Sequence, residues 1–372
     1  MKSTKYKNSK DSQDFISQLL EQNGYTHINL YFDGLNHFIR NFASGYGTLQ
    51  DATGKDVSGL YYSINSLISI IKLFIQKNIH RNDISVHMVI EHNRSKKMQS
   101  IYPEYKQNRK TPLAITLDEV EKNEMFKYNL EEFVAFCELL SKDILTYHMH
   151  GVEGDFIIAY LLYNNRAKRT SNDKVLDVII STDRDFYQLL KLTDLVIFNP
   201  NTYKMITKDN FKDVLSIKYN VDVNSFLLYK LLIGDPSDNI KGFTGPVNAS
   251  KAISFLNSLT QSSITNLSDL YYMANEFITS PSSKISKTQY TLFNNIVNNY
   301  DYLQKVFKII DLSYDNVLDM LQPIDVLSMN KIYENNSTIN DSRGRDLSYF
   351  FAKHNFDSSF LLEAERYLFT KS

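Results

Sequence analysis

The sequence predicts an α/β protein with a mostly parallel central sheet flanked by helices, followed by a helical half. Two observations support this fold class. In the first half, short apolar or β-branched segments bounded by polar turns alternate with helical patterns, which is typical of βαβ units. After about residue 204 the strand-like segments fade, and helical patterns continue to the C-terminus.

The predicted elements follow one another regularly along the chain. The strand-like segments are 28–32, 86–90, 144–150 and 178–180. A helix is expected at 61–75, where Ile64, Leu67, Ile68 and Ile71 form an apolar stripe. Further helical patterns in the first half cover 130–140 and 156–162. In the second half the clearest helical patterns are 223–233, 246–256 and 288–307.

Each of the four strand-like segments is followed by one or two acidic residues. The carboxyl ends of parallel strands face one crevice, where ligands bind, so these side chains are expected to converge. An acid after a strand is often only a solvated loop residue or a helix N-cap, but that explanation suits one acid better than a whole set. The acids are Asp33, Glu91, Glu153, Asp155, Asp183 and Asp185.

Converging carboxylates indicate a cation. They repel one another and cannot all stay ionised at neutral pH unless a cation neutralises them. Oxygen ligands without Cys or His at metal spacing suit magnesium or manganese. Two such ions can activate a water and hold both oxygens of a phosphodiester displacement, so the pattern predicts metal-dependent phosphodiester hydrolysis.

A second acidic pair lies in the helical half. Asp235 and Asp238 are three residues apart and are followed by Gly242 and Gly245, a pattern that suits a turn between helices.

Four motifs together resemble the 5′-nuclease superfamily, the flap endonucleases and 5′→3′ exonucleases with a PIN-like fold. They occur in the family's order between about residues 28 and 253. A further short segment, 343–351, resembles the last helix of the phage enzymes called ribonuclease H, which favours the phage branch. The four motifs are Tyr102-Pro103-Glu104-Tyr105-Lys106-Gln107-Asn108-Arg109, Gly151-Val152-Glu153-Gly154-Asp155, Ile179-Ile180-Ser181-Thr182-Asp183-Arg184-Asp185-Phe186-Tyr187-Gln188-Leu189 and Gly234-Asp235-Pro236-Ser237-Asp238-Asn239-Ile240.

The resemblance implies two divalent ions, magnesium with manganese as a substitute. It places Asp33, Glu91, Glu153 and Asp155 around the first ion, Asp183 and Asp185 between the two, and Asp235 and Asp238 nearer the second. Inner-shell and outer-shell roles stay open for each acid. The resemblance also implies that Lys106 reaches the scissile phosphate, that Arg109 supports it, and that residues 94–129 form an arch through which a 5′ strand passes.

Three departures from the family pattern concern the metal site and the DNA-binding loop. Glu91 stands where the family usually has Asp, and Phe156 replaces a commonly charged residue. The helix-turn-helix-type hairpin at 242–252 lacks a later glycine of the family, which leaves open whether it binds a monovalent cation.

Basic residues are concentrated near the predicted arch. The stretch 94–110 holds six basic residues against one acid, and its tyrosines offer faces on which unpaired bases could stack. A lone charged run is usually a solvated face, but its place beside an acidic crevice favours nucleic-acid binding. The nucleic-acid candidates are Arg94, Lys97, Tyr105, Lys106, Arg109, Lys241, Ser250 and Lys251.

Composition fits a protein of two domains, expected at 1–205 (catalytic) and 206–372 (helical, DNA-binding). The 372 residues include 41 basic and 42 acidic ones, a formal net charge of −1, which does not exclude nucleic acid because the distribution of charge matters more than its sum. Cys137 is the single cysteine, so no internal disulfide can form. No signal core or long apolar span is found, so a cytoplasmic location is expected, the host cytoplasm if a phage encodes the chain.

These features predict a monomeric, structure-specific 5′-nuclease that removes RNA primers or 5′ flaps during DNA replication and leaves a 5′-phosphate. Its expected partners are DNA with 5′ ends, flaps or RNA–DNA hybrids, and a single-stranded DNA-binding protein or the replication machinery; no membrane is expected. Two alternatives stay open, a non-catalytic module that binds DNA junctions and a PIN-domain ribonuclease. The sequence ranks neither RNA against DNA flaps nor exonuclease against endonuclease activity.

Overall fold

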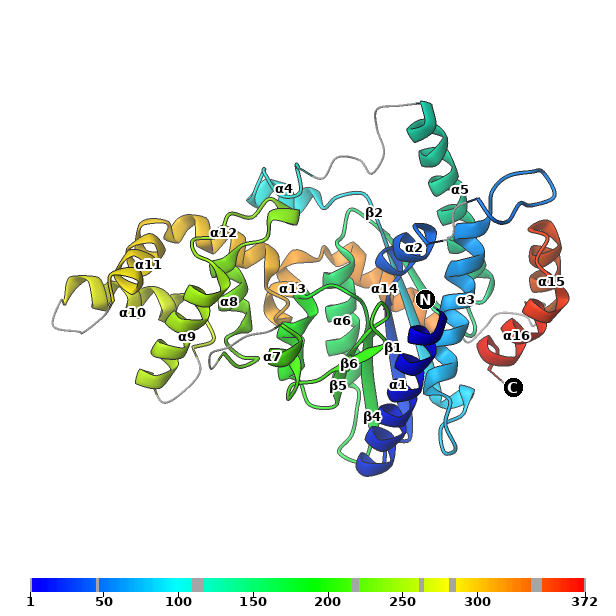
Figure 1. Cartoon of the computed structure of the whole chain (residues 1–372), viewed down its shortest axis with the longest axis horizontal. Helices are drawn as coiled ribbons and strands as arrows, with labels where there is room; N and C mark the ends of the chain where they lie inside the picture. Colours follow the sequence, from blue (N-terminus) through cyan, green and yellow to red (C-terminus); the bar gives the residue numbers. More distant parts are fainter. Residues whose placement is uncertain are drawn as a thin grey trace.

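The computed structural model describes residues 2–44, 47–108, 117–215, 221–260, 264–280, 286–335 and 343–370. These ranges fold around a six-stranded sheet with the strand order β3-β2-β1-β4-β5-β6 (Figure 1). Strands β1 to β5 run parallel, and β6 pairs antiparallel with β5 at one edge. The strands are β1 (His27–Asp33), β2 (Ile84–His92), β3 (Leu145–His150), β4 (Val175–Ile180), β5 (Leu195–Asn199) and β6 (Lys204–Ile206).

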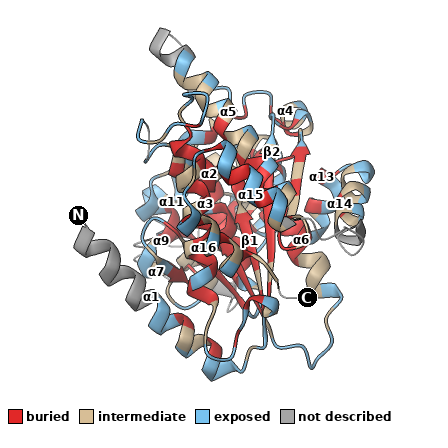
Figure 2. Cartoon of the chain, turned by 90° about the vertical axis from the view of Figure 1, so that its right-hand side faces the viewer, coloured by how far each residue is buried: buried red, intermediate tan, exposed pale blue. Residues whose placement is uncertain are grey.

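The sheet separates two apolar cores. Successive strand side chains point to opposite faces, so Leu30 and Phe32 of β1 enter one core and Tyr31 enters the other. Figure 2 shows buried residues concentrated along the strands and on the helix faces turned toward them. The strands therefore read as nearly continuous apolar runs, as expected for a parallel sheet covered on both sides.

One face of the sheet is covered by helices from both ends of the chain. Helix α3 packs against α5 and α16, and α15 packs against α5. The two C-terminal helices (red in Figure 1) thus belong to the core of this face. The helices here are α1 (Lys2–Asn23), α2 (Gly34–Phe42), α3 (Ser58–Phe74), α5 (Leu117–Leu139), α15 (Arg343–Lys353) and α16 (Ser358–Leu368), with the short 3₁₀ helix η1 (Arg81–Asp83) before β2.

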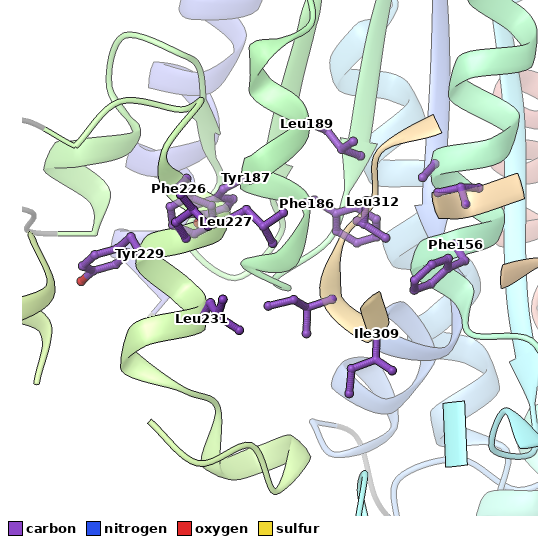
Figure 3. Close-up of a cluster of buried hydrophobic side chains, with 14 of the residues drawn as sticks. Phe156, Phe186, Tyr187, Leu189, Phe226, Leu227, Tyr229, Leu231, Ile309 and Leu312 are labelled. Carbon is purple, nitrogen blue, oxygen red and sulfur yellow. The ribbon is translucent and has the colours of Figure 1, made fainter. Parts of the chain in front are cut away.

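The opposite face carries α6 and the helices of the second half. Figure 3 shows how Phe156 of α6, Phe186 of η2, Phe226 of α8 and Leu312 join these elements in one apolar cluster. The elements of this side are α4 (Lys96–Ile101), α6 (Gly154–Ala167), η2 (Asp185–Lys191), α7 (Phe211–Val214), α8 (Phe226–Ile233), η3 (Pro236–Asp238), α9 (Pro246–Thr260), α10 (Leu267–Thr279), α11 (Lys287–Asn298), α12 (Tyr300–Ile310), α13 (Tyr314–Met320) and α14 (Pro323–Asn335).

The predicted elements are largely confirmed. The four strand segments coincide with strands, except that Ile144 precedes β3, and the helix expected at 61–75 is α3. The helix expected at 288–307 is instead two helices, because Asn299 leaves the helical conformation and lies between α11 and α12. Strands β5 and β6 and helix α1 were not predicted.

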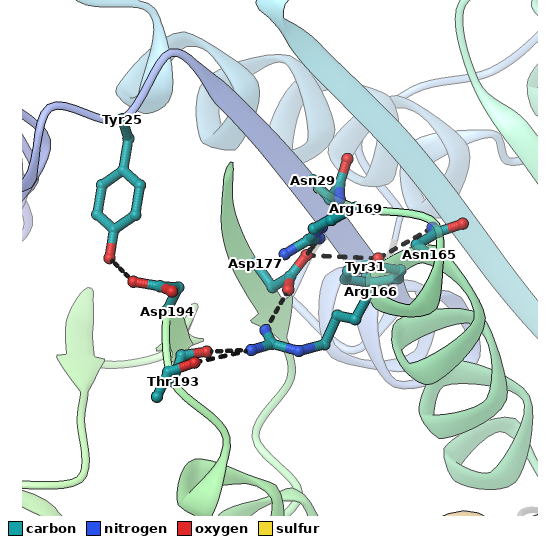
Figure 4. A network of polar contacts seen from close by, with 9 residues as sticks. All are labelled: Tyr25, Asn29, Tyr31, Asn165, Arg166, Arg169, Asp177, Thr193 and Asp194. Atoms are coloured by element: carbon teal, nitrogen blue, oxygen red, sulfur yellow. Dashed lines mark hydrogen bonds and ion pairs between the residues drawn. The ribbon is translucent and has the colours of Figure 1, made fainter. Parts of the chain in front are cut away.

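The amino-terminal edge of the sheet is held by a buried charge network (Figure 4). The Asp177 carboxylate on β4 is fully buried and forms ion pairs with Arg166 at 2.6 Å and Arg169 at 2.5 Å. Asn29 donates to the same carboxylate at 3.0 Å. Two guanidinium groups offset the desolvation of one carboxylate, so this network ties α6 to the centre of the sheet.

The second half of the chain does not form one separate body in the structure. The expected helical domain covered 206–372, whereas α15 and α16 pack on α3 and α5, on the other side of the sheet from α8 and α9. No described helix is both long and apolar enough to cross a membrane.

Candidate metal and nucleic-acid site

Seven of the eight predicted acids line one cavity of about 160 Å³ at the carboxyl ends of the central strands. They come together because β1 lies between β2 and β4, so the ends of three neighbouring strands meet at one edge. Lys106 lines the same cavity. The seven acids are Asp33, Glu91, Glu153, Asp155, Asp183, Asp185 and Asp238.

Asp33 ends β1 and caps α2. One of its carboxylate oxygens accepts a hydrogen bond from the Asn36 amide at 3.3 Å, and the other accepts one from the Ser181 hydroxyl at 2.8 Å. The next residue, Gly34, has no room for a side chain, because a Cβ there would lie 2.6 Å from the Val89 carbonyl oxygen. Burial, followed by the negative charges of Glu91 and Asp183, raises the pKa of Asp33 to about 7.

Glu91 extends from the end of β2 to the start of α6. Its carboxylate accepts a hydrogen bond from the Gly154 amide at 2.6 Å, where the free N–H groups of a helix N-terminus favour a negative charge. The extra methylene that distinguishes Glu from the family's usual Asp is thus used to reach the helix. Glu91 lines the cavity.

Glu153 and Asp155 flank that same helix start. Glu153 is buried, forms an ion pair with Lys106 and accepts a hydrogen bond from the Ser95 amide at 3.4 Å. Burial, together with the charge of Glu153, raises the pKa of Asp155 well above its usual range. Phe156, where the family often has another acid, packs instead into the core beneath α6.

Asp183 and Asp185 lie in a tight turn after β4. The Asp183 amide donates to the Ser181 hydroxyl at 3.0 Å, and the Asp185 amide donates to the Asp183 carboxylate at 2.9 Å. These bonds aim both side chains into the crevice. Asp185 also forms an ion pair with Lys230, which reaches it from α8.

The loop after α8 brings the second acidic pair toward the sheet. Gly234 has a φ of 72° and lies so close to Gly242 that a Cβ on it would be 2.3 Å from the Gly242 amide nitrogen. Asp238 lines the cavity, whereas Asp235 is outside its lining and pairs with Lys230 at 3.5 Å. Burial would raise the pKa of Asp235, but hydrogen bonds from Ser237 and the charge of Lys230 lower it.

The backbone of Lys106 is hydrogen-bonded to that loop. It has a φ of 55°, and its amide donates to the Asp238 carbonyl oxygen at 3.0 Å. Burial would lower the pKa of Lys106, but the charges of Glu153, Glu91 and Asp238 outweigh it and raise the pKa. Lys106 is therefore a buried, charged ammonium group beside the acids. Arg109 lies outside the described residues.

The remaining nucleic-acid candidates occupy different places. Arg94 and Lys97 line a groove of about 340 Å³ that shares Glu153 with the acidic cavity. Tyr105 also lines the cavity, but only 3% of it is exposed and the Lys106 ammonium lies 4.9 Å from its ring centroid, so little of its face is open for stacking.

The candidates beside α9 also differ from one another. Lys241 and Lys251 are exposed, as phosphate contacts require. Ser250 is buried, and its hydroxyl donates to the backbone carbonyls of Pro246 and Val247 at 2.9 and 3.1 Å. In this arrangement the Ser250 hydroxyl is not directed toward a ligand.

The donor set suits a hard cation. Among the described residues, no three Asp, Glu, His or Cys side chains are already arranged to hold an ion. Two carboxylates, Glu153 and Asp185, are instead turned toward the ammonium groups of Lys106 and Lys230. The oxygen-only lining and the raised pKa values of Asp33 and Asp155 are what a divalent ion would relieve, so the residues fit such an ion.

The mostly parallel sheet and the acid-lined crevice at its carboxyl edge, together with the match to a family model, place the chain in the 5′-nuclease superfamily. More closely, the chain belongs to the family described as "5′-3′ exonuclease, N-terminal resolvase-like domain", whose model matches residues 29–216.

Curated relatives share part of the chain. A 5′-3′ exonuclease of Buchnera aphidicola (from Acyrthosiphon pisum) is 24% identical over 204 residues, which cover 54% of this chain and 61% of the relative. A DNA polymerase I of Caldicellulosiruptor bescii is 35% identical over 152 residues, 40% of this chain and 15% of the relative. The chain thus spans less than two thirds of these relatives.

Solved structures share the fold over most of the chain. The D15 protein of bacteriophage T5, co-crystallised with metal ions, superposes with a TM-score of 0.62 at 18% identity, covering 83% of this chain and 100% of that one. The T5 D15 flap endonuclease in a pseudo-enzyme–product complex with DNA and metal ions gives 0.63 at 18% identity, covering 84% and 100%. The predicted mostly parallel sheet flanked by helices is confirmed by this likeness.

Several site residues were not found from the sequence. Ser181 and Asn36 orient Asp33, and Lys230 pairs with two of the acids. Only Ser181 lay within a recognised motif. Lys230 gave no signal, because a single lysine in an apolar helix usually faces solvent.

Proposed function

We propose that this protein is a structure-specific 5′-nuclease that hydrolyses phosphodiester bonds in DNA carrying 5′ ends or flaps. The observation that carries the proposal is the single cavity shared by seven carboxylates and Lys106. The family membership of residues 29–216 supports it, as do relatives named 5′-3′ exonuclease.

We further propose two divalent ions, magnesium with manganese as a substitute, held by the acids around the cavity. Bound there, such ions would lower the pKa of a coordinated water and offset charge on the phosphodiester. The chain's own contribution is positional. Ser181 and Gly154 orient Asp33 and Glu91, and Lys106, which lines the same cavity, would contact a phosphate oxygen of a bound substrate.

The substrate follows from the charges around the cavity. Arg94 and Lys97 line the neighbouring groove that shares Glu153 with the cavity, and Lys241 and Lys251 are exposed before and within α9. Their contacts would be to phosphates, which position DNA without reading its sequence. We therefore propose that the region after residue 206 binds the DNA duplex and that residues 94–129 guide the 5′ strand. We also propose that the protein acts as a monomer, together with the replication machinery, to remove primers or flaps.

Asp183→Asn tests the proposed reaction. Loss of this central carboxylate should reduce magnesium-dependent cleavage at least 1,000-fold while leaving the fold and DNA binding largely intact, because the substitution keeps the shape of the side chain. The assay uses labelled flap, nicked and RNA-primed duplexes with the full chain.

The matched control is Asp209→Asn, which removes the same charge from an exposed position outside the cavity. Cleavage by Asp183→Asn at the parental rate would rule out the carboxylate mechanism. Tight binding to a junction without cleavage by the parent, with magnesium or manganese, would favour a non-catalytic junction-binding module.

A further inference from the structure

Three histidines form a cluster at one edge of the sheet, apart from the acidic cavity. His92 ends β2, and His148 and His150 lie two residues apart on β3, the edge strand next to it. The ring centroids of His92 and His150 are 4.6 Å apart, and the His148 ring lies 5.3 Å from His150 and 5.8 Å from His92. The described lining of the acidic cavity includes none of the three.

Strand geometry explains why these rings meet. Side chains alternate along a strand, and Met149, between the two β3 histidines, is buried in the core on the α6 side. His148 and His150 therefore point to the other face of the sheet, where α5 packs on β3. His92 is the register partner of His150 in the neighbouring parallel strand, so its side chain lies on the same face.

The three rings are accessible to an ion. His92 and His150 are exposed and His148 is half-buried, and His150 also lines the groove of Arg94 and Lys97. Within the described part of the chain, no hydrogen bond engages their ring nitrogens. Burial, followed by the charge of His150, lowers the pKa of His148, so at neutral pH this ring is in the uncharged form that binds metals.

The spacing of the rings matches that of imidazoles around a transition-metal ion. Zn–N bonds of about 2.0–2.1 Å place the centroids of tetrahedrally arranged imidazoles roughly 5 Å apart. Among the described residues, neither these rings nor the acids of the cavity are already arranged around an ion. Rotation about the Cβ–Cγ bond would turn the nitrogens inward with little movement of each ring centre, because this bond points at the centre of the ring.

We propose that His92, His148 and His150 bind one divalent transition-metal ion of the zinc class, with water completing its coordination. Imidazole nitrogens suit zinc, nickel and copper, whereas carboxylates suit magnesium and manganese, so this site takes a different class of ion from the acidic cavity. The bound ion joins the end of the edge strand β3 to β2. The inference goes beyond the proposed function, because it requires none of the acids.

Equilibrium dialysis of the full chain against Zn²⁺, with excess Mg²⁺ to compete for the carboxylates, tests this site. The parent should retain one Zn²⁺ that Mg²⁺ does not displace. His148→Gln and His150→Gln should each weaken its binding about tenfold or more, because each removes one of three protein ligands. His27→Gln is the matched control: it removes an exposed histidine from β1 and should leave the affinity unchanged.

Asp183→Asn separates this site from the acidic cavity, and it should retain the same Zn²⁺ as the parent. Loss of that ion from Asp183→Asn but not from His150→Gln would place it on the acids and overturn the inference. Equal retention by the parent and both histidine variants, with folding checked by circular dichroism, would also overturn it and leave the cluster as surface ring packing.

The outcomes for this site and for the proposed function can be told apart. A parent that cleaves flaps but retains no Zn²⁺ in excess Mg²⁺ sinks this inference alone, whether or not the variants fold. A parent that retains one Zn²⁺ through the histidines but cleaves no flap with magnesium or manganese upholds the inference and sinks the proposed function.

Discussion

At the scale of residues, the site depends on how each charge is compensated. Asp33 and Asp155 have raised pKa values because burial and neighbouring acids disfavour their charged forms, whereas Glu153 and Asp185 face ammonium groups. Strand-end carboxylates could be found in the sequence because each one follows a local apolar segment. Lys230, the lysine that pairs with Asp185, could not be found, because it comes from a helix that is distant from Asp185 in sequence.

Lys106→Ala should slow cleavage about 100-fold or more while changing DNA affinity by less than about threefold. The reason is that one buried ammonium beside the acids stabilises charge that develops during reaction, whereas affinity arises from many phosphate contacts. Single-turnover cleavage and equilibrium binding of a labelled flap measure the two effects separately. Lys191→Ala, at an exposed position outside the cavity, is the control, and equal cleavage rates for the two variants would refute the role of Lys106.

Buried histidines should make the protein acid-sensitive. Burial, with the charge of Arg40, lowers the pKa of His37 to about 3, and burial, with Lys168, lowers the pKa of His87 to about 3. The unfolded chain then binds more protons, so stability is complete above about pH 6.5 and falls as the pH drops toward 3.

At pH 5 each of these histidines should reduce the free energy of unfolding by about 2 kcal/mol relative to pH 7.5. Asp33, whose pKa is raised, binds a proton over the same range and offsets part of this loss, so the test compares variant with parent. Urea unfolding at the two pH values should show about 2 kcal/mol less destabilisation by acid in His37→Asn than in the parent, and the same pH dependence in both would contradict a buried neutral His37.

At the scale of elements, close backbone contacts and buried charges set how the pieces meet. Gly34 lets β1 and α2 approach β2, and Gly234 lets the acidic loop fold back on Gly242. The Lys106 amide donates a hydrogen bond to the Asp238 carbonyl oxygen, and this bond links the turn after α4 to the loop after α8. Glycines and acids in these motifs were visible in the sequence, whereas the hydrogen bonds between the two loops depend on the packing of α8.

Asp177→Asn should lower the free energy of unfolding by about 3–5 kcal/mol, because it leaves Arg166 and Arg169, whose side chains are only 18% and 16% exposed, with no full negative charge between them. Chemical denaturation measures the loss. Asp194→Asn is the control in the same network: its carboxylate accepts a hydrogen bond from Tyr25 in an exposed position, and its loss should cost less than about 1 kcal/mol. Similar losses in both variants would show that the two arginines do not depend on Asp177.

At the scale of the whole molecule, the chain crosses from one face of the sheet to the other and back. Helices α8 to α14 continue the core that begins at α6, and α15 and α16 then return to α3 and α5. Arg81 fixes this return by donating to the Leu368 carbonyl oxygen at 2.9 Å. The last helices therefore contribute to the stability of the sheet, and α15 packs against α5.

Leu368→Ala should lower the free energy of unfolding by about 2–5 kcal/mol, because this side chain is fully buried in the core beside α3. Leu362→Ala, in the same helix but 66% exposed, should change it by less than about 0.5 kcal/mol. Urea denaturation compares the two. Equal effects would mean that α16 is not packed against the sheet in solution.

The sequence by itself determined the sheet-forming segments, the acids that end them and the class of chemistry that we propose, because each of these depends on a local pattern. Only the tertiary structure decided which acids share the cavity, that Asp235 stands outside it beside Lys230, and that α15 and α16 cover the α3 face. The physical reason is that burial and ion pairing depend on contacts between segments that are distant in sequence. The periodicity within one segment does not encode which other segment it will contact.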